Sequence, residues 1–329
     1  MNFINSQLRQ DLVSGDWIVI APKRAKKPEQ FIKKEKRIKA PIKGCPFENP
    51  QKSEHEVLNL TRRDGDWSLQ IIKNKYPAFI HKAICPTIKK NGSYSVIDGV
   101  GYHNLLITRD HYKNFPRLNP AEAFAVFRAI QEHYRQLAGD KCVAYISMFH
   151  NWGPKAGASI YHPHYQIVAI PVVPSDIGHS LAGSDNYFKK NKKCVHCAII
   201  EQEKKNKNRV VFENKGAIAF APFVSKEPFE LRIFPKKHLP YFEDTSEGDL
   251  KFVSEVLQKS LAMMEKKLKD PDYNFFIHTS PVSEKRKHGH YHWHIEIQPK
   301  ISISAGFELG TGIEITAVDP DEAAKILKR

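Results

Sequence analysis

The feature that most constrains the fold is an internal duplication. Each half of the chain passes through a cysteine segment, strands, a histidine, a helix, another strand and a histidine cluster, in that order. Self-similarity of this kind indicates that both halves build the same supersecondary unit. The sequence therefore predicts an α+β fold of two similar halves, each a mostly antiparallel sheet with one packed helix. The matching segments are CPFE and CVHC (45–48 and 194–197), RDHYKNF and PKKHLPYF (109–115 and 235–242), and HPHYQIVAIP and HWHIEIQP (162–171 and 292–299).

Each half contains one segment typical of an amphipathic helix. Residues 119–138 begin with Asn119 as an N-cap, Pro120 at the first helical position and Glu122 at the third. Apolar residues then recur at helical spacing, and residues 246–268 show the same pattern. Strands are predicted around these helices, at 16–22, 67–74, 104–109, 142–150 and 165–171 in the first half and at 217–223, 229–235, 274–280 and 292–299 in the second.

The length of the chain agrees with this division. At 329 residues it can hold about two domains of ordinary size. The halves are predicted to join near 172–190, where Pro, Gly, Ser and Asp are frequent. We therefore expect residues 1–175 to form the half with the HPHYQ segment. Residues 176–329 form the half that carries the cysteine pair and completes the substrate site.

Composition excludes several classes of protein. No run approaches the roughly 20 apolar residues that span a bilayer, so no membrane association is expected. The first residues lack the charged and apolar regions of a signal peptide. The five cysteines are an odd and sparse set, which argues against a disulfide scaffold and for a reducing compartment. The expected location is the cytoplasm.

The net charge of +15 raises the question of nucleic-acid binding. The lysines crowd two stretches, 23–43 and 189–209, where acidic and polar residues are mixed in and aromatic residues are not interleaved. A stacking platform for nucleic acid needs such aromatics. The pattern favours solvated surface loops, or a positive field that attracts a small phosphorylated substrate. No nucleic-acid partner is expected.

The second half contains a set of residues suited to a metal ion. Cys194 and Cys197 form a C-x-x-C pair, and His238 and His292 fall at matching points of the repeat. Tetrahedral zinc takes four nitrogen or sulfur ligands, and the two-residue gap lets one turn direct both thiolates at one ion. A redox pair is the alternative, but no thioredoxin-like unit surrounds these cysteines. We predict zinc here, with His196 pointing away from the ion at the surface.

The first half has a related set. Cys45, His111 and His162 stand at the corresponding places, and Glu48 replaces the second cysteine. A carboxylate can ligate zinc, so this set is chemically workable. Fewer soft ligands make other divalent metals more plausible, and loss of the metal is a further alternative. We predict zinc at this site as well.

The histidine pair of the first half indicates chemistry beyond metal binding. Alternate residues of an extended segment share a face, so His162, His164 and Gln166 project together. If His162 binds a metal, His164 is free to act as a rigidly held nucleophile. Gln166 could donate a hydrogen bond to a phosphoryl oxygen as charge develops there.

These motifs resemble a known family. The H-P-H-x-Q segment, preceded by FHNWGPKAGAS (149–159), closely resembles the active-site segment of the galactose-1-phosphate uridylyltransferases, which belong to the histidine-triad superfamily. The hydrolases of that superfamily carry H-x-H-x-H, and Gln166 stands in place of the third histidine. The resemblance covers most of the chain and includes DLVSGDWIVIAPKRAKKP, CPFE, IKNKYPAF, RDHY, PFELRIFPKKH, HWHIEIQP and AGFELGTG. It implies two tandem histidine-triad-like halves.

The resemblance also implies a mechanism and a site. In such enzymes the histidine matching His164 attacks the α-phosphorus of a nucleotide sugar, releases a hexose 1-phosphate and carries the nucleotidyl group to an acceptor. Family members are commonly homodimers that share residues across the interface. By matching position, the nucleotide, phosphate and sugar sites are lined by Asn74, Asn151, Gly157, Ser159 and Gln166, with basic Arg24 and Lys27 and with acidic Glu308 for the sugar.

Departures from the family pattern leave alternatives open. The segment QPKISIS lacks the arginine and lysine of typical galactose enzymes, and CVHC with GFELGTGIEI is similar to the branch that includes ADP-glucose phosphorylases. Glu296 follows His294 where a catalytic glutamine is required, so the second half is predicted to be non-catalytic. The leading hypothesis is a hexose-1-phosphate nucleotidyltransferase, with uridylyl transfer (galactose 1-phosphate and UDP-glucose) ahead of adenylyl transfer. A nucleotide hydrolase is the next alternative, and a zinc-stabilised nucleic-acid-binding protein is the last.

Overall fold

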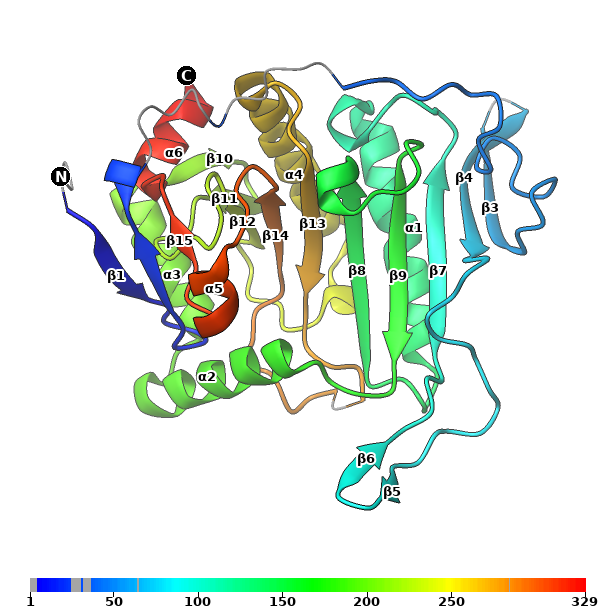
Figure 1. The fold of residues 1–329 in the computed structure, drawn as a ribbon, viewed down its shortest axis with the longest axis horizontal. Helices are drawn as coiled ribbons and strands as arrows, with labels where there is room; N and C mark the ends of the chain where they lie inside the picture. The colour runs from blue at the N-terminus through cyan, green and yellow to red at the C-terminus, as the bar shows by residue number, and fades with distance from the viewer. Residues whose placement is uncertain (1–4, 25–30, 32–36, 64, 284) are drawn as a thin grey trace.

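A ten-stranded antiparallel sheet forms the centre of the molecule (Figure 1). The computed structural model describes residues 5–24, 31, 37–63, 65–283 and 285–329. Along the sheet the strands run in the order β10, β11, β12, β14, β13, β8, β9, β7, β4 and β3. Their bounds, in that order, are Val210–Glu213, Ala217–Phe220, Leu231–Pro235, His294–Pro299, Tyr273–His278, Tyr145–Trp152, His164–Ile170, Tyr102–Thr108, Asp66–Lys73 and Val57–Arg63.

The strand order repeats about the centre of the sheet. From the centre outwards, the first half contributes β8, β9, β7, β4 and β3, and the second half contributes β13, β14, β12, β11 and β10. Corresponding strands follow one another in the same chain order, and β8 pairs with β13 where the halves meet. The predicted α+β fold of two similar halves is confirmed. The boundary between residues 175 and 176 stays a prediction.

One helix from each half covers the same face of the sheet. Helix α1 (Pro120–Ala138) begins at the predicted Asn119 cap, whose side chain accepts from Glu122 N while the Glu122 carboxylate accepts from Asn119 N. Helix α4 (Glu247–Leu268) begins after Ser246, whose hydroxyl accepts from Asp249 N. Both helices pack their apolar faces on inward-facing strand residues such as Leu106, Met148, Ile167, Ile277 and Ile295. Because strand residues alternate, the other face of the sheet is left for the site.

Smaller elements surround this sheet. Strands β1 (Gln7–Gln10) and β2 (Trp17–Ile20) pair with β15 (Ile315–Thr316), so the two ends of the described chain meet in one three-stranded sheet. The predicted connection at 172–190 is mostly helix α2 (Ser175–Asn191), because Ile177 and Leu181 are buried on one helical face. The remaining elements are the hairpin β5 (Lys89–Asn91) and β6 (Tyr94–Val96), helices α3 (Val195–Asn206), α5 (Gly306–Thr311) and α6 (Pro320–Lys328), and short 3-10 helices at Pro22–Arg24, Phe115–Arg117, Pro154–Ala156 and Phe242–Asp244. No helix in the described parts is long and apolar enough to cross a bilayer.

The odd, sparse cysteines argued against a disulfide scaffold, and they did not indicate the one disulfide that the structure contains. Cys85 and Cys142 are bonded, with their Cα atoms 4.9 Å apart. The bond ties the base of the β5–β6 arm, which projects from the body in Figure 1, to the loop after α1. Counting cysteines missed it because the pairing depends on which loops the sheet brings together. The cytoplasmic location stays a prediction.

Close packing between α2 and the β1–β2 turn gives a test of this architecture. A Cβ added at Gly183 lies 1.7 Å from Val13 O, whereas one added at Gly178 of the same helix meets nothing within 4 Å. We expect Gly183→Ala to lower the free energy of unfolding by about 1–3 kcal/mol through overpacking. Gly178→Ala is the matched control and should raise it by up to about 1 kcal/mol through helix propensity. If urea denaturation shows the same change in the free energy of unfolding for both variants, the close contact between Gly183 and Val13 is contradicted.

Candidate active site

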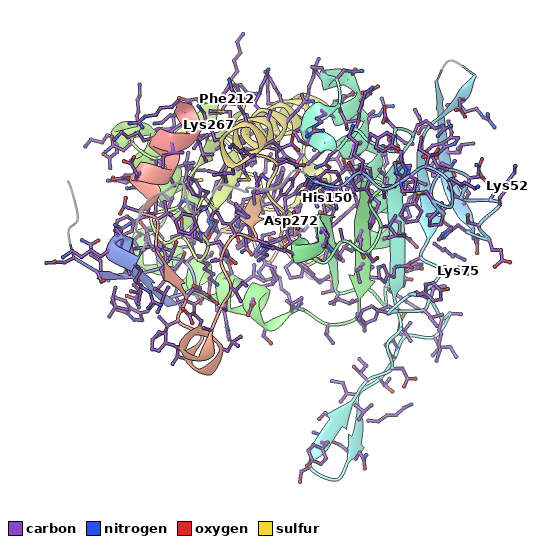
Figure 2. The ribbon with its side chains drawn as sticks, turned by 45° about the horizontal axis from the view of Figure 1, so that its top comes forward. Lys52, Lys75, His150, Phe212, Lys267 and Asp272 are labelled. Carbon is purple, nitrogen blue, oxygen red and sulfur yellow. A yellow bond between two sulfur atoms is a disulfide. The ribbon has the colours of Figure 1, made fainter. Side chains whose placement is uncertain are left out.

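A cavity of about 660 Å³ opens at the start of β9, on the face of the sheet opposite α1 and α4. Four predicted site residues line it together: Asn74, Ser159, His164 and Gln166. They come from the end of β4, from the loop before β9 and from β9 itself. The other lining residues are Pro46, Phe47, Lys52, Ser53, Glu54, His55, Lys75, Tyr76, Leu105 and Ile160. Lys52 and Lys75 mark this edge of the molecule in Figure 2.

His164 has the geometry of a nucleophile. Its Nδ1 lies 2.9 Å from His162 O. A carbonyl oxygen only accepts, so Nδ1 carries the hydrogen, and in the neutral ring the lone pair is on Nε2. Burial lowers the pKa of His164, which keeps the ring neutral. The Phe47 ring packs edge-on at 5.2 Å between ring centroids and restricts the imidazole to this orientation.

The first predicted metal cluster stands directly behind this nucleophile. Cys45, His111 and His162 each place a ligand atom within 4.8 Å of the others. His111 Nε2 and His162 Nε2 lie 3.1 and 2.6 Å from the carbonyl oxygens of Ala40 and Thr108, so both Nε2 atoms carry hydrogen. Both Nδ1 lone pairs therefore point into the cluster, as metal-ligating histidines do. Burial lowers the pKa of His162 to about 4, which favours the neutral ligand form.

Glu48 completes this cluster. Its Oε1 lies 3.2 Å from His111 Nδ1 and 3.4 Å from His162 Nδ1. Oε1 and His111 Nδ1 are both buried, and neither has a hydrogen-bond partner among the described residues. The other carboxylate oxygen accepts from Arg109 Nη1 at 2.8 Å. Two nitrogens, one sulfur and one oxygen thus converge. Cys45 Sγ lies 3.6 Å from His162 Nδ1, and the other two atoms find no partner in the described parts of the chain. This donor set fits a divalent cation.

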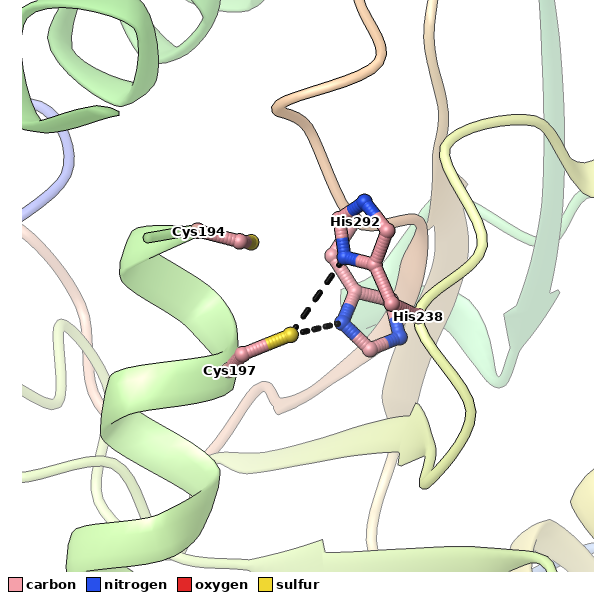
Figure 3. A group of neighbouring side chains, drawn as sticks. All are labelled: Cys194, Cys197, His238 and His292. Carbon is pink, nitrogen blue, oxygen red and sulfur yellow. Dashed lines mark hydrogen bonds between the residues drawn. The ribbon is translucent and has the colours of Figure 1, made fainter. Parts of the chain in front are cut away.

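The second predicted metal cluster is shown in Figure 3. Cys194, Cys197, His238 and His292 place their ligand atoms within 4.8 Å of one another. Cys194 caps helix α3, and Cys197 lies one turn later on the same side. Cys197 Sγ lies 3.3 Å from His238 Nδ1 and 3.6 Å from His292 Nδ1. His238 Nε2 donates to Gly289 O at 2.8 Å, which directs the Nδ1 lone pair at the sulfurs.

The electrostatics of this cluster favour a cation. A hydrogen bond from the Cys197 thiol lowers the pKa of Cys194 well below its ordinary value. The same bond raises the pKa of Cys197, so Cys194 is the cysteine of the pair that ionises first. A sulfur anion beside two imidazole lone pairs is a donor set that fits zinc.

His196 is not at the surface, and that prediction is wrong. It points away from the metal cluster, but it is only 1% exposed, because α3 packs on the sheet. Its ring contacts Phe234 and His294 at 5.6 and 5.1 Å between centroids. Burial lowers its pKa well below the ordinary value, so the ring is neutral.

Asn151 and Gly157 lie beside the cavity and do not line it. Phe149 pairs with Gln166, so by alternation Asn151 shares the face of His164. Asn274, from the second half, donates from Nδ2 to Asn151 Oδ1 and to Ala156 O, both at 2.8 Å. This contact fastens the loop before Gly157, whose φ of +83° suits glycine, onto the end of β8.

Two predicted residues, Arg24 and Glu308, are not brought to the cavity of this chain, and the structure does not describe a third. Arg24 is exposed on the 3-10 helix at Pro22–Arg24, and Lys27 falls outside the described residues. Glu308 lies on α5, where its carboxylate accepts from Ala305 N at 3.0 Å. Two neighbours of the cavity were missed. Phe47 lay within a motif assigned to metal binding. His103 lay one residue before the predicted strand 104–109, and extending that strand would have placed His103 on the same face as Leu105.

The second half presents a filled copy of the site. His294 Nδ1 lies 3.2 Å from His292 O, as His164 does with His162. Leu105 stands opposite Gln166 in the first half, whereas Arg232 stands opposite Glu296 in the second. Arg232 Nε lies 3.1 Å from the Glu296 carboxylate, so an internal ion pair occupies the corresponding space. His278 is the cross-strand partner of His294 and was not predicted.

Comparison with known proteins places the chain in a family. The family model described as a domain of unknown function, DUF4921, matches residues 70–329. ADP-glucose phosphorylase from Arabidopsis thaliana is 33% identical over 328 residues, which cover 98% of this chain and 92% of that protein. Galactose-1-phosphate uridylyltransferase from Thermotoga maritima is 26% identical over 331 residues, which cover 98% of each.

Solved structures agree. The crystal structure of Arabidopsis thaliana ADP-glucose phosphorylase with bound ADP-glucose superposes with a TM-score of 0.84 at 30% identity, covering 99% of both chains. A uridylyltransferase structure superposes with a TM-score of 0.75 at 26% identity, covering 98% of this chain and 97% of that one. The chain therefore belongs to the DUF4921 family and, within the histidine-triad superfamily, to the galactose-1-phosphate uridylyltransferase family, which includes the ADP-glucose phosphorylases.

Proposed function

We propose that this protein is a hexose-1-phosphate nucleotidyltransferase that forms a covalent nucleotidyl intermediate on His164. One observation carries the proposal: the His164 imidazole is held by His162 O through Nδ1 and presents an unprotonated Nε2 to a cavity that also contains Gln166. Gln166 in place of a third histidine argues against the alternative of a hydrolase, which needs a helper for water. A nucleic-acid-binding role has no support in this site.

The transfer proceeds in two balanced steps. His164 Nε2 attacks the α-phosphorus of the nucleotide sugar, the bond to the bridging oxygen breaks, and hexose 1-phosphate leaves. The imidazole becomes cationic as the N–P bond forms, and the Nδ1–H bond to His162 O stabilises that charge. An acceptor phosphate oxygen then attacks the same phosphorus and releases His164. The Gln166 amide donates to a phosphoryl oxygen in both steps.

The relatives bear on which nucleotide is transferred. From the sequence we expected uridylyl transfer ahead of adenylyl transfer, because uridylyl transfer is the commoner reaction in the family. The similarity to ADP-glucose phosphorylase, at 33% identity and a TM-score of 0.84, supports the reverse order. We therefore propose adenylyl transfer from ADP-glucose to phosphate or a sugar phosphate, with uridylyl transfer to galactose 1-phosphate as the alternative.

Two metal ions are part of the proposal. Zinc is held by Cys194, Cys197, His238 and His292 in the second half and by Cys45, Glu48, His111 and His162 in the first, where the mixed donors also admit other divalent ions. Each ion would cross-link the separate segments of the chain that carry its ligands. In the first half it fixes His162, whose carbonyl orients His164.

A homodimer is also proposed. Phe307 and Leu309 on α5 are 49% and 78% exposed and flank Glu308. A second copy packed on this surface would cover them and could bring Glu308 to the cavity of its neighbour. Glu308 would then serve the sugar as the family resemblance implies.

The nucleophile can be tested by intact-protein mass after mixing with ADP-glucose or UDP-glucose without acceptor. We expect one adenylyl group per chain, stable to alkali and lost in acid as a phosphoramidate, and mapping to His164. His164→Ala should form no adduct and lose at least about a thousandfold in turnover. His179→Ala, which removes an exposed imidazole on α2, is the control and should behave as wild type. An adduct on His164→Ala would rule out this assignment, and a uridylyl adduct would keep it with the alternative substrate.

The second metal cluster predicts the metal content of the purified protein. We expect Cys197→Ser to lose about one equivalent of zinc per chain, measured by mass spectrometry of the metal. It should also unfold at a lower temperature, because ligation contributes to folding. The double variant Cys85→Ser/Cys142→Ser removes two sulfurs without touching either cluster and should keep its zinc. Unchanged zinc in Cys197→Ser means that the cluster binds no metal.

The first cluster predicts a change of metal preference. Glu48→Cys restores a second thiolate, and we expect its zinc affinity to rise about tenfold or more, measured by competition with a chromogenic chelator. Glu48→Gln, of the same shape but without charge, should bind less metal than wild type. In both variants Arg109 retains its ion pair with Asp66, whose carboxylate lies 2.9 Å from Arg109 Nε. If neither variant shifts metal binding, Glu48 is not a ligand.

A further inference from the structure

His103 is the polar residue in closest contact with Gln166. It is the second residue of β7 and shares a sheet face with Leu105, which stands opposite Gln166. From this diagonal position its Nε2 reaches to 2.9 Å from Gln166 Oε1. On the other side of the ring, Ala78 N lies 3.2 Å from Nδ1. Asn74 Nδ2, at the cavity wall, lies 3.0 Å from the same Nε2.

Two of the three contacts agree on where the hydrogen of the ring lies. The third comes from a donor, because Asn74 Oδ1 accepts from Tyr76 N and its NH₂ group therefore faces His103 Nε2. A backbone N–H can only donate, so Nδ1 accepts from Ala78 and carries no hydrogen. A neutral imidazole with its hydrogen on Nε2 accepts from Ala78 N and donates to Gln166 Oε1, and it makes no hydrogen bond with the Asn74 amide. A hydrogen on Nδ1 would satisfy the Asn74 contact alone, so the Nε2 hydrogen satisfies more of the contacts. The oxygen of the Gln166 carboxamide is thereby engaged. Its NH₂ group has no acceptor among the described residues and faces the cavity that Gln166 lines.

We propose that His103 is a positioning residue that holds the Gln166 carboxamide with its NH₂ group toward the nucleotidyl phosphate. The inference rests on the proposed function and adds a residue to it. Without His103, the carboxamide can rotate by half a turn and present its oxygen to a phosphoryl oxygen, which is repulsive. The bond therefore ensures that Gln166 donates as negative charge develops on the phosphoryl group.

The second half supports this assignment by contrast. Leu105 corresponds to Arg232 across the repeat, so His103 corresponds to Glu230. Glu230 is fully buried, and its carboxylate accepts from Arg232 Nε at 3.2 Å. The pairing of an imidazole donor (His103) with a carboxamide (Gln166) is therefore found only in the first of the two halves, which is the half proposed to bind a phosphate. In the second half the residue at this position, Glu230, takes part in an ion pair with Arg232.

Two substitutions separate positioning from packing. The Gln side chain can place an N–H near the position of His Nε2, whereas Asn can place an acceptor near that of Nδ1. We therefore expect His103→Gln to form the His164 adduct within about threefold of the wild-type rate at saturating nucleotide sugar. His103→Asn and His103→Ala should be slowed about 10- to 100-fold, with little change in the half-saturating concentration. Retained activity in His103→Asn with loss in His103→Gln would show that His103 acts through Ala78, and would overturn the proposal.

Controls keep the outcome decisive. His81→Ala removes an exposed ring that stacks on Tyr102, the neighbour of His103, and should leave the rate unchanged. Thermal unfolding identifies any variant that fails to fold. The proton position is read separately from activity, by ¹⁵N chemical shifts of the His103 ring in the wild-type protein. A hydrogen on Nε2 supports the proposal and one on Nδ1 overturns it, even if no nucleotide sugar forms an adduct and the proposed function fails.

Discussion

The pairing of β8 with β13 is the interaction on which the rest of the structure depends. It joins two five-stranded halves into one sheet, and both faces of the joint carry polar contacts between the halves. On the helix side, Asn114 donates to Tyr273 OH at 2.7 Å in the buried core. On the site side, Asn274 bonds both Asn151 and the loop carbonyl of Ala156. The second half therefore does more than repeat the first: it fastens the strand and loop that border the nucleophile. Such buried, satisfied polar contacts favour one register of the joint over others.

Duplication leaves two copies of the site, and their charges explain why the first copy lines a cavity while an ion pair occupies the second. In the second half Arg232 is buried between Glu230 and Glu296. Burial opposes ionisation, yet Arg232 still lowers the pKa of Glu296 well below its ordinary value. A pair of this kind fills space and satisfies itself. Removing one partner would leave a buried charge, which costs about 3–5 kcal/mol. In the first half Leu105 and Gln166 carry no charge, so the corresponding space is open to a phosphorylated ligand.

The sequence predicted most of the fold because its patterns are local. Asn119 with Glu122, and the alternation of strand residues, depend on neighbours within a few positions. The two metal clusters were also predictable, since the repeat aligned them. What the sequence could not supply was set by distant contacts. Cys85 pairs with Cys142 only because the arm folds back on the loop after α1. His196 looked exposed within its motif, but packing of α3 on the sheet buries it. Glu308 was transferred by similarity alone, and one chain does not bring it to the cavity.

The first candidate metal cluster and His164 are coupled through a single residue, His162. His162 gives its Nδ1 to the cluster, its Nε2–H to Thr108 O and its own carbonyl to His164 Nδ1. The ring and the backbone of His162 are thus both fixed, and the position of its carbonyl decides which nitrogen of His164 is free to react. This relation explains why the motif separates two histidines by a single proline. A change of ligand at Glu48 alters how firmly that carbonyl is held, while the reacting atoms stay the same.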